Sequence, residues 1–128
     1  MALPTITAEG GLVAQPEVRF SGDGKAYVTG RLACNDRKRG PDGNWVDGDP
    51  TFIDFIVFGQ MGERLAESVG KGDQVVLVGA LQQREYEKDG EKRTTYGIRV
   101  ESAAVSVRFR TAKADEKPAP AGAKGSSW

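Results

Sequence analysis

The chain has 128 residues, with 18 basic and 18 acidic side chains, no histidine and a single cysteine. This length is enough for one domain with its own hydrophobic core and requires no disulfide or structural metal. The balanced charge excludes a generally basic surface, so any binding of a polyanion depends on local clusters of cations and on stacking.

The compartment can be inferred from three features of the sequence. The N-terminal segment MALPTITAEGG lacks the basic start and the apolar run of a secretory signal. The single Cys34 cannot form an internal disulfide, which is typical of a reducing compartment. The longest apolar stretch, Val75 to Leu81, is too short to span a bilayer. We therefore expect a cytoplasmic protein that does not enter a membrane.

Turn signals divide most of the chain into short runs rich in Val, Ile, Thr and aromatic residues. The turns read EGG, SGDGK, RGPDG, DGDP, GKGD and EKDGEK. Such spacing is typical of a small all-β barrel or sandwich. We predict strands over residues 4–13, 17–20, 26–35, 51–58, 73–86, 93–102 and 105–110.

The segment GQMGERLAESVGKG departs from the strand pattern. Met61, Leu65 and Val69 recur every four residues on a polar background, and Gly70 follows them. This spacing predicts a short amphipathic helix that stops at the glycine.

Two hairpins are predicted on either side of this helix. Asp89-Gly90 lies between two strand-like runs and is a strong signal for a tight turn. The other hairpin, NDRKRGPDGNWVDGDPTF, is expected to carry a longer loop, basic at its start and with Trp45 near its tip.

The composition changes after residue 110. TAKADEKPAPAGAKGSSW is rich in Ala, Lys, Pro, Gly and Ser and cannot bury enough apolar surface to fold. We predict a folded domain over 1–110 and a disordered tail over 111–128. For the domain, the strands and single helix suit an OB-fold, with an SH3-like barrel or a sandwich as the alternatives.

The stretch DPTFIDFIVFGQ at residues 49–60 is apolar on both faces. Read as a strand, it places Phe52, Ile56 and Phe58 on one side together with Asp54. Ile53, Phe55 and Val57 lie on the other side. One face is therefore expected to pack on the core. The other face is either covered by another part of the protein or binds a second molecule.

Several classes of enzyme site are excluded. Without histidine there is no Ser-His or Cys-His nucleophile, and one cysteine cannot build a zinc site. Lys71 lacks the glycines and the Ser/Thr of a phosphate loop. The acidic loop DGNWVDGD fails as a calcium site, because Ile53 falls where the bidentate Glu is needed. We expect a protein that is not an enzyme and holds no cofactor or metal.

Aromatic and cationic side chains gather in the two hairpins and on the doubly apolar strand. Bases of a single strand stack on such rings while cations contact the phosphates. Taken singly, Phe52 and Phe58 are more often buried and a run such as Arg37-Lys38-Arg39 is more often simply solvated, whereas Trp45 near a loop tip has little core to reach. We expect Tyr27, Phe55 and Tyr96 in the core or an interface. Their co-occurrence favours a nucleic-acid site made of Phe20, Arg31, Arg37, Lys38, Arg39, Trp45, Phe52, Phe58, Arg84, Tyr86, Lys92 and Arg93.

The order of motifs over about residues 3–110 resembles the bacterial single-stranded DNA-binding proteins of the SSB family. The matching segments are GGLVAQPEVRF, GRLACN, TFIDFIVFGQMGERLAESVGKGDQV, VGALQQREYEKDGEKRTTYGIRVESA and VRFRTAKA. The resemblance implies an OB-fold of five strands, a homotetramer built as a dimer of dimers, and single-stranded DNA bound without sequence preference. It also implies that VSVRFRTAKA forms an additional C-terminal strand that clamps a neighbouring subunit.

In this resemblance Phe52 and Phe58 are similar to the family's stacking aromatics, and Tyr86 and Phe20 fall at two further aromatic positions. Three departures accompany it. Arg37-Lys38-Arg39 stands where many relatives carry an aromatic, and Asp54 stands near a position that is often basic. The acidic tip that recruits replication and repair proteins is replaced by AKGSSW.

We therefore expect a non-catalytic, nucleoid-associated protein that protects single-stranded DNA during replication, recombination or repair. The alternative is an SSB-like module that serves mainly in protein assembly at a primosome or recombination complex. The absent acidic tip and Asp54 favour this alternative.

Overall fold

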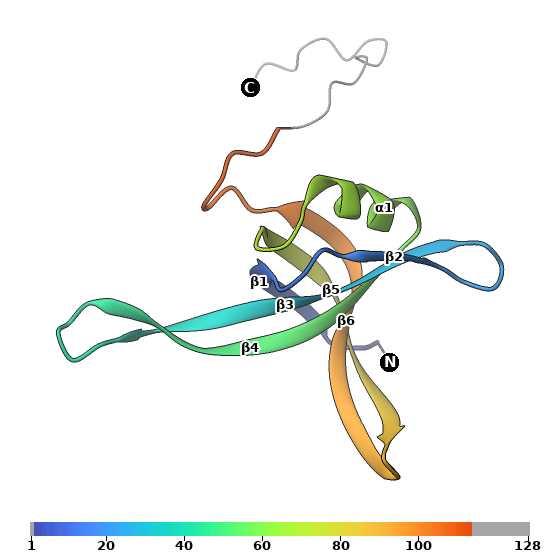
Figure 1. Ribbon diagram of the computed structural model, residues 1–128, viewed down its shortest axis with the longest axis horizontal. Helices are drawn as coiled ribbons and strands as arrows, with labels where there is room; N and C mark the ends of the chain where they lie inside the picture. Colours follow the sequence, from blue (N-terminus) through green and yellow to red (C-terminus); the bar gives the residue numbers. More distant parts are fainter. Residues whose placement is uncertain (1, 114–128) are drawn as a thin grey trace.

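A computed structural model describes residues 2–113 of the chain. Along the chain it contains six strands and one helix, shown in Figure 1. They are β1 (Thr5–Leu12), β2 (Glu17–Phe20), β3 (Ala26–Arg39), β4 (Trp45–Phe58), α1 (Gly59–Ser68), β5 (Gln74–Lys88) and β6 (Glu91–Val105).

The strands form one sheet that closes on itself. Its order is β1-β5-β6-β4-β3-β2, and an additional pairing of β1 with β3 completes a ring of five strands. β4 and β6 are joined in parallel over Asp54–Ile56 and Gly97–Arg99, while the other pairs are antiparallel. This closed five-stranded barrel with one short helix confirms the predicted OB-fold.

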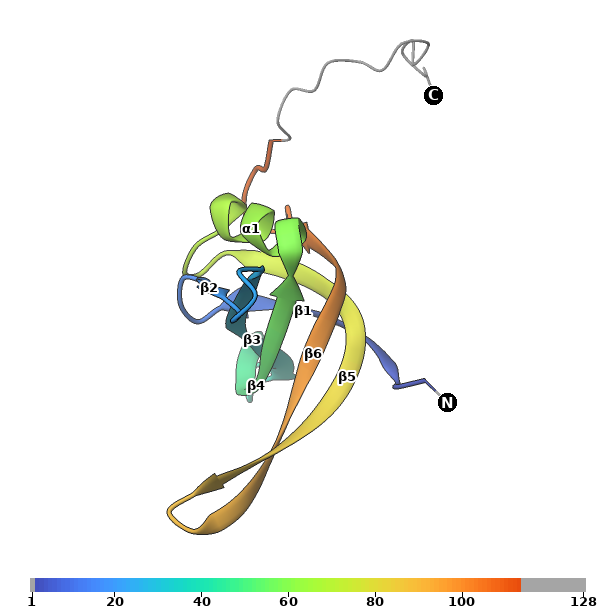
Figure 2. The ribbon, with the colours of Figure 1, turned by 90° about the vertical axis from the view of Figure 1, so that its right-hand side faces the viewer.

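The core fills the barrel and is covered at one end by α1. Its most deeply buried side chains are aliphatic, namely Leu32, Leu77, Ile98, Val28, Val57 and Val75. The helix adds Leu65, and Val69 follows directly after its end, so the four-residue spacing in the sequence marks the buried side as predicted. Figure 2 shows the helix at one end of the barrel and the β5–β6 hairpin extending from the other.

Two hairpins project well beyond the barrel. The β3–β4 strands stay paired out to Arg39 and Trp45, where we predicted a long loop over most of these residues. The chain reverses between them in a turn in which Asp42 accepts hydrogen bonds from the backbone and side chain of Asn44. The predicted β5–β6 turn is confirmed, with positive φ angles of 54° at Asp89 and 78° at Gly90.

The predicted strand over residues 105–110 is wrong for the single chain. β6 ends at Val105, and only Ser106 continues the pairing, by donating its N–H to the Gln74 carbonyl. Ion pairs from Arg108 to Glu9 and from Arg110 to Asp73 then hold the segment against the barrel. A strand needs a neighbour for its backbone groups, and residues 107–110 have none within the described range 2–113.

No helix among residues 2–113 is long and apolar enough to cross a membrane. From residue 114 onward, the predicted tail lies outside the described residues.

Candidate nucleic-acid interface

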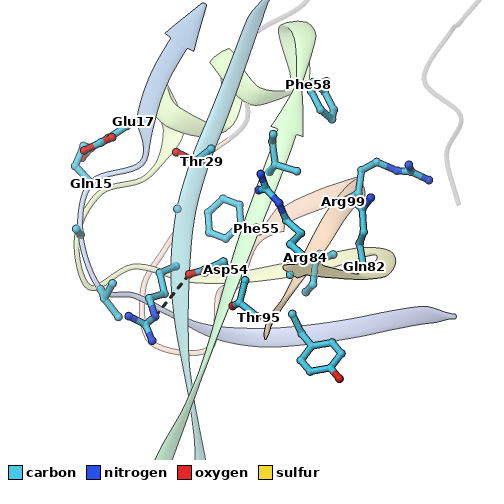
Figure 3. A pocket seen from close by; sticks show the side chains of 18 residues that line it. Gln15, Glu17, Thr29, Asp54, Phe55, Phe58, Gln82, Arg84, Thr95 and Arg99 are labelled. Carbon is cyan, nitrogen blue, oxygen red and sulfur yellow. Dashed lines mark ion pairs between the residues drawn. The ribbon is translucent and has the colours of Figure 1, made fainter. Parts of the chain in front are cut away.

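A groove of about 720 Å³ is lined by residues of β3 and β4 and by the parts of β5 and β6 where their hairpin leaves the barrel. The segment that joins β1 to β2 completes its wall. Figure 3 shows Asp54 and Phe55 of β4 near the middle of the view, with Arg84, Gln82 and Arg99 to one side of them and Gln15 and Glu17 to the other. The wall consists of Val13, Ala14, Gln15, Glu17, Thr29, Gly30, Arg31, Asp54, Phe55, Ile56, Phe58, Gln82, Arg84, Thr95, Tyr96, Gly97, Ile98 and Arg99.

β4 supplies both the buried and the exposed aromatic rings of this region. Phe55 and Val57 are buried, whereas Phe52 and Phe58 are 48% and 55% exposed. Phe55 lies opposite Gly30 on β3, and a Cβ at Gly30 would come within 2.4 Å of the Phe55 ring. The ring therefore fits only because position 30 has no side chain. The predicted division of this strand into an inner and an outer face is confirmed.

Cations lie beside the exposed rings. The Arg31 guanidinium is 4.7 Å from the centre of the Phe52 ring, and that of Arg39 is 5.4 Å from the centre of the Trp45 ring. Arg31 also pairs with Asp54, Nε to Oδ1, at 3.7 Å. Arg84 lines the groove and extends to a second hollow that includes Phe58.

The structure divides the predicted site residues into separate regions. Arg31, Phe58 and Arg84 line the groove, and Phe52 joins them through its contact with Arg31. Phe20 lies at the end of β2, 66% exposed. The remaining predicted residues are exposed along the two projecting hairpins: Arg37, Lys38, Arg39 and Trp45 on β3–β4, and Tyr86, Lys92 and Arg93 on β5–β6.

Tyr96 is a groove residue that sequence reasoning placed in the core or an interface. Its side chain is 53% exposed in the single chain, although the alternation along β6 would place it on the same face as the buried Ile98 and Val100. Tyr96 is exposed because it lies two residues from Ile98 toward the projecting hairpin, where the barrel core has already ended. Arg99, Gln82 and Gln15 were also missed, and nothing in their local sequence separates them from ordinary surface residues.

Two properties of the described residues concern nucleophilic and metal chemistry. Burial raises the pKa of the Cys34 thiol, which keeps it in the protonated, weakly nucleophilic form at neutral pH. Residues 2–113 contain no cluster of three or more acidic or cysteine side chains that could hold a metal ion. The groove instead combines aromatic rings, arginines and amides.

Comparison with known proteins identifies the family. A model of the single-strand binding protein family matches residues 3–109. The chain belongs to this family. Membership agrees with the closed five-stranded barrel described above.

Actinobacterial proteins named for single-stranded DNA binding match most of the chain. The chain is 39% identical to a single-stranded DNA-binding protein of Corynebacterium glutamicum, over 91% of this chain and 52% of the relative. It is 37% identical to one of Mycobacterium leprae, over 88% and 68%. The crystal structure of a small single-stranded DNA-binding protein from Streptomyces coelicolor matches with a TM-score of 0.74 at 27% identity, covering 84% of this chain and 97% of that one. The chain thus spans about half to two thirds of the length of the two curated family members.

Proposed function

We propose that this chain binds single-stranded DNA without sequence preference and has no catalytic activity. Bases stack on the exposed rings, and arginines and lysines contact the phosphates. The DNA would be coated in this way during replication, recombination or repair, in the cytoplasm and at the nucleoid. The relatives are named for single-stranded DNA binding, which supports the same ligand here.

The observation that carries this proposal is the outer face of β4. Phe52 and Phe58 are about half exposed although each is a large apolar ring, and Arg31 and Arg84 lie close to them. Rings and cations in this arrangement supply both interactions that a single strand needs, and neither interaction reads the base sequence. Tyr96 provides another exposed ring on the far side of the groove.

Titration with oligo-dT tests the proposal. We expect saturable quenching of the fluorescence of Trp45 and the tyrosines, because bases stack on exposed rings. The affinity should fall as salt rises, with a slope of log K against log salt of about −0.7 for each phosphate contacted. Duplex DNA of the same length is the control. Binding to the duplex that equals or exceeds binding to oligo-dT would contradict the proposal.

We also propose that the chain assembles into a homotetramer built as a dimer of dimers. Val107 and Phe109 support an intersubunit contact, since they are 68% and 76% exposed on the segment that leaves the barrel. Together with their neighbours they would gain strand partners from a second subunit. Light scattering should then give four times the chain mass of 13.7 kDa. A monomeric mass at micromolar concentration would contradict this assembly.

Protein assembly remains the second candidate function, and two observations favour it. Asp54 places a carboxylate among the exposed rings of β4, and Val107 and Phe109 offer apolar contacts. Recruitment of replication or repair proteins through the tail concerns residues outside the described range. Weak binding of oligo-dT by a folded dimer, together with firm binding of a purified primosome or recombination protein, would select this function.

A further inference from the structure

Arg31 is held between a carboxylate and an aromatic ring on the outer face of the barrel. In the antiparallel β3–β4 pair, Arg31 lies directly opposite Asp54, and Phe52 is its diagonal neighbour. Such neighbours are within reach of a long side chain. The guanidinium accordingly lies 4.7 Å from the Phe52 ring centre while its Nε is 3.7 Å from Asp54 Oδ1.

This contact occupies groups that the proposed ligand would use. A guanidinium is planar and stacks on an aromatic face, as a base does. A carboxylate pairs with arginine as a phosphate oxygen does. In the free protein, therefore, Arg31 covers the Phe52 ring where a base would stack, and Asp54 takes the place of a phosphate beside Arg31.

Asp54 differs from the other charged residues of the groove. Glu17, the other carboxylate in the wall, pairs with Arg19, which lies outside this wall. Arg84 and Arg99 have no carboxylate within ion-pair distance among residues 2–113. Of the groove arginines, Arg31 is thus the one that is already paired in the described part of the chain.

We propose that Asp54 lowers the affinity of this face for single-stranded DNA by holding Arg31 over Phe52, a contact that must be exchanged for base and phosphate when the strand binds. This inference rests on the proposed function. The side chains of Arg31 and Asp54 are 55% and 57% exposed, so the exchange needs no rearrangement of the core. An exposed pair of this kind contributes little to folding, and its loss should leave the fold unchanged.

The substitution Asp54→Asn tests the inference, because it removes the charge and keeps the shape. We expect oligo-dT to bind about fivefold more tightly at low salt, which corresponds to the interaction of two unit charges about 4 Å apart in water. The slope of log K against log salt should steepen by up to about 0.7, since one more cation is free for a phosphate.

Asp49→Asn is the matched control. It makes the same charge change on the same strand, and Asp49 is exposed and has no ion-pair partner among the described residues. Its effect on affinity should stay below about twofold. An equal gain from Asp49→Asn would overturn the inference, since it would show a general effect of net charge.

A double-mutant cycle with Arg31→Gln separates an action through Arg31 from simple repulsion of phosphate. If Asp54 acts through Arg31, Asp54→Asn should change the affinity by less than about twofold in the Arg31→Gln background. The same gain in both backgrounds would overturn the inference. Thermal melts of all variants check that each one folds.

The parent titration distinguishes the two possible failures. A parent chain that binds oligo-dT, together with an Asp54→Asn variant that binds equally or more weakly, overturns this inference alone. A parent chain and variant that both fail to bind oligo-dT overturn the proposed function and this inference with it.

Discussion

The triple substitution Phe52→Ala, Phe58→Ala and Tyr86→Ala is expected to weaken binding of oligo-dT by about 3–9 kcal/mol, at least about a hundredfold. Each base stacked on an aromatic ring contributes about 1–3 kcal/mol by alanine substitution. The three rings lie on β4 and on the β5–β6 arm, and each is about half exposed. Fluorescence or anisotropy titration at fixed salt measures the loss.

The binding that the triple variant retains should keep the salt dependence of the parent. Arg31, Arg84 and the cations of the two arms are unchanged, so the slope of log K against log salt should stay near that of the parent. The fold should also persist, because the replaced rings lie outside the buried core. Circular dichroism and the unfolding midpoint in urea check this.

A variant that keeps three rings is the matched control: Phe52→Tyr, Phe58→Tyr and Tyr86→Phe. It should bind within about one order of magnitude of the parent, since stacking tolerates a change of ring substituent. If the alanine variant folds normally and binds oligo-dT as the parent does, the assignment of the stacking face is wrong.

Gly79→Ala is expected to destabilise the barrel by about 3 kcal/mol or more. A Cβ at this position would lie 2.1 Å from the Arg99 carbonyl oxygen and 2.9 Å from Ile98 Cγ2. β5 cannot move away easily, because Gly79 is paired with Ile6 of β1 on one side and Val100 of β6 on the other. The clash is with backbone, so no side-chain rotation relieves it.

Gly22→Ala is the control for this prediction. A Cβ at Gly22 meets no atom within 4 Å, and its φ lies outside the left-handed region. Its unfolding free energy should stay within about 1 kcal/mol of that of the parent. Urea unfolding followed by circular dichroism measures both variants. Equal midpoints for Gly79→Ala and the parent would show that β5 and β6 can separate without cost.

Local features of the sequence predicted several parts of the structure. Alternation along 51–58 separated the buried Phe55 and Val57 from the exposed Phe52 and Phe58. The Asp89-Gly90 pair predicted its own turn, because few other residues adopt positive φ. The resemblance to the SSB family, carried by motif order, supplied the fold and the candidate rings.

Other features could not be derived from local pattern. The predicted β3–β4 hairpin is longer than its sequence indicates, since Gly, Pro and Asp signal a loop there. Pairings such as Arg37 with Asp47, Lys38 with Val46 and Arg39 with Trp45 keep the arm extended. The alternation along β6 predicts that Tyr96 is buried like Ile98, but the barrel core ends before Tyr96 and leaves its side chain exposed. Residues 107–110 of the predicted strand have no strand partner among the described residues.

By itself the sequence determined how the side chains of β4 divide between its two faces, which side of α1 packs on the core and where the β5–β6 turn lies, because these depend on neighbours within a few residues. Only the tertiary structure decided that Arg31 meets both Asp54 and Phe52, and that Tyr96 faces a groove. These contacts depend on the register between strands and on where the barrel closes. Both are fixed by pairings between residues far apart in the chain, such as Asp54 with Gly97.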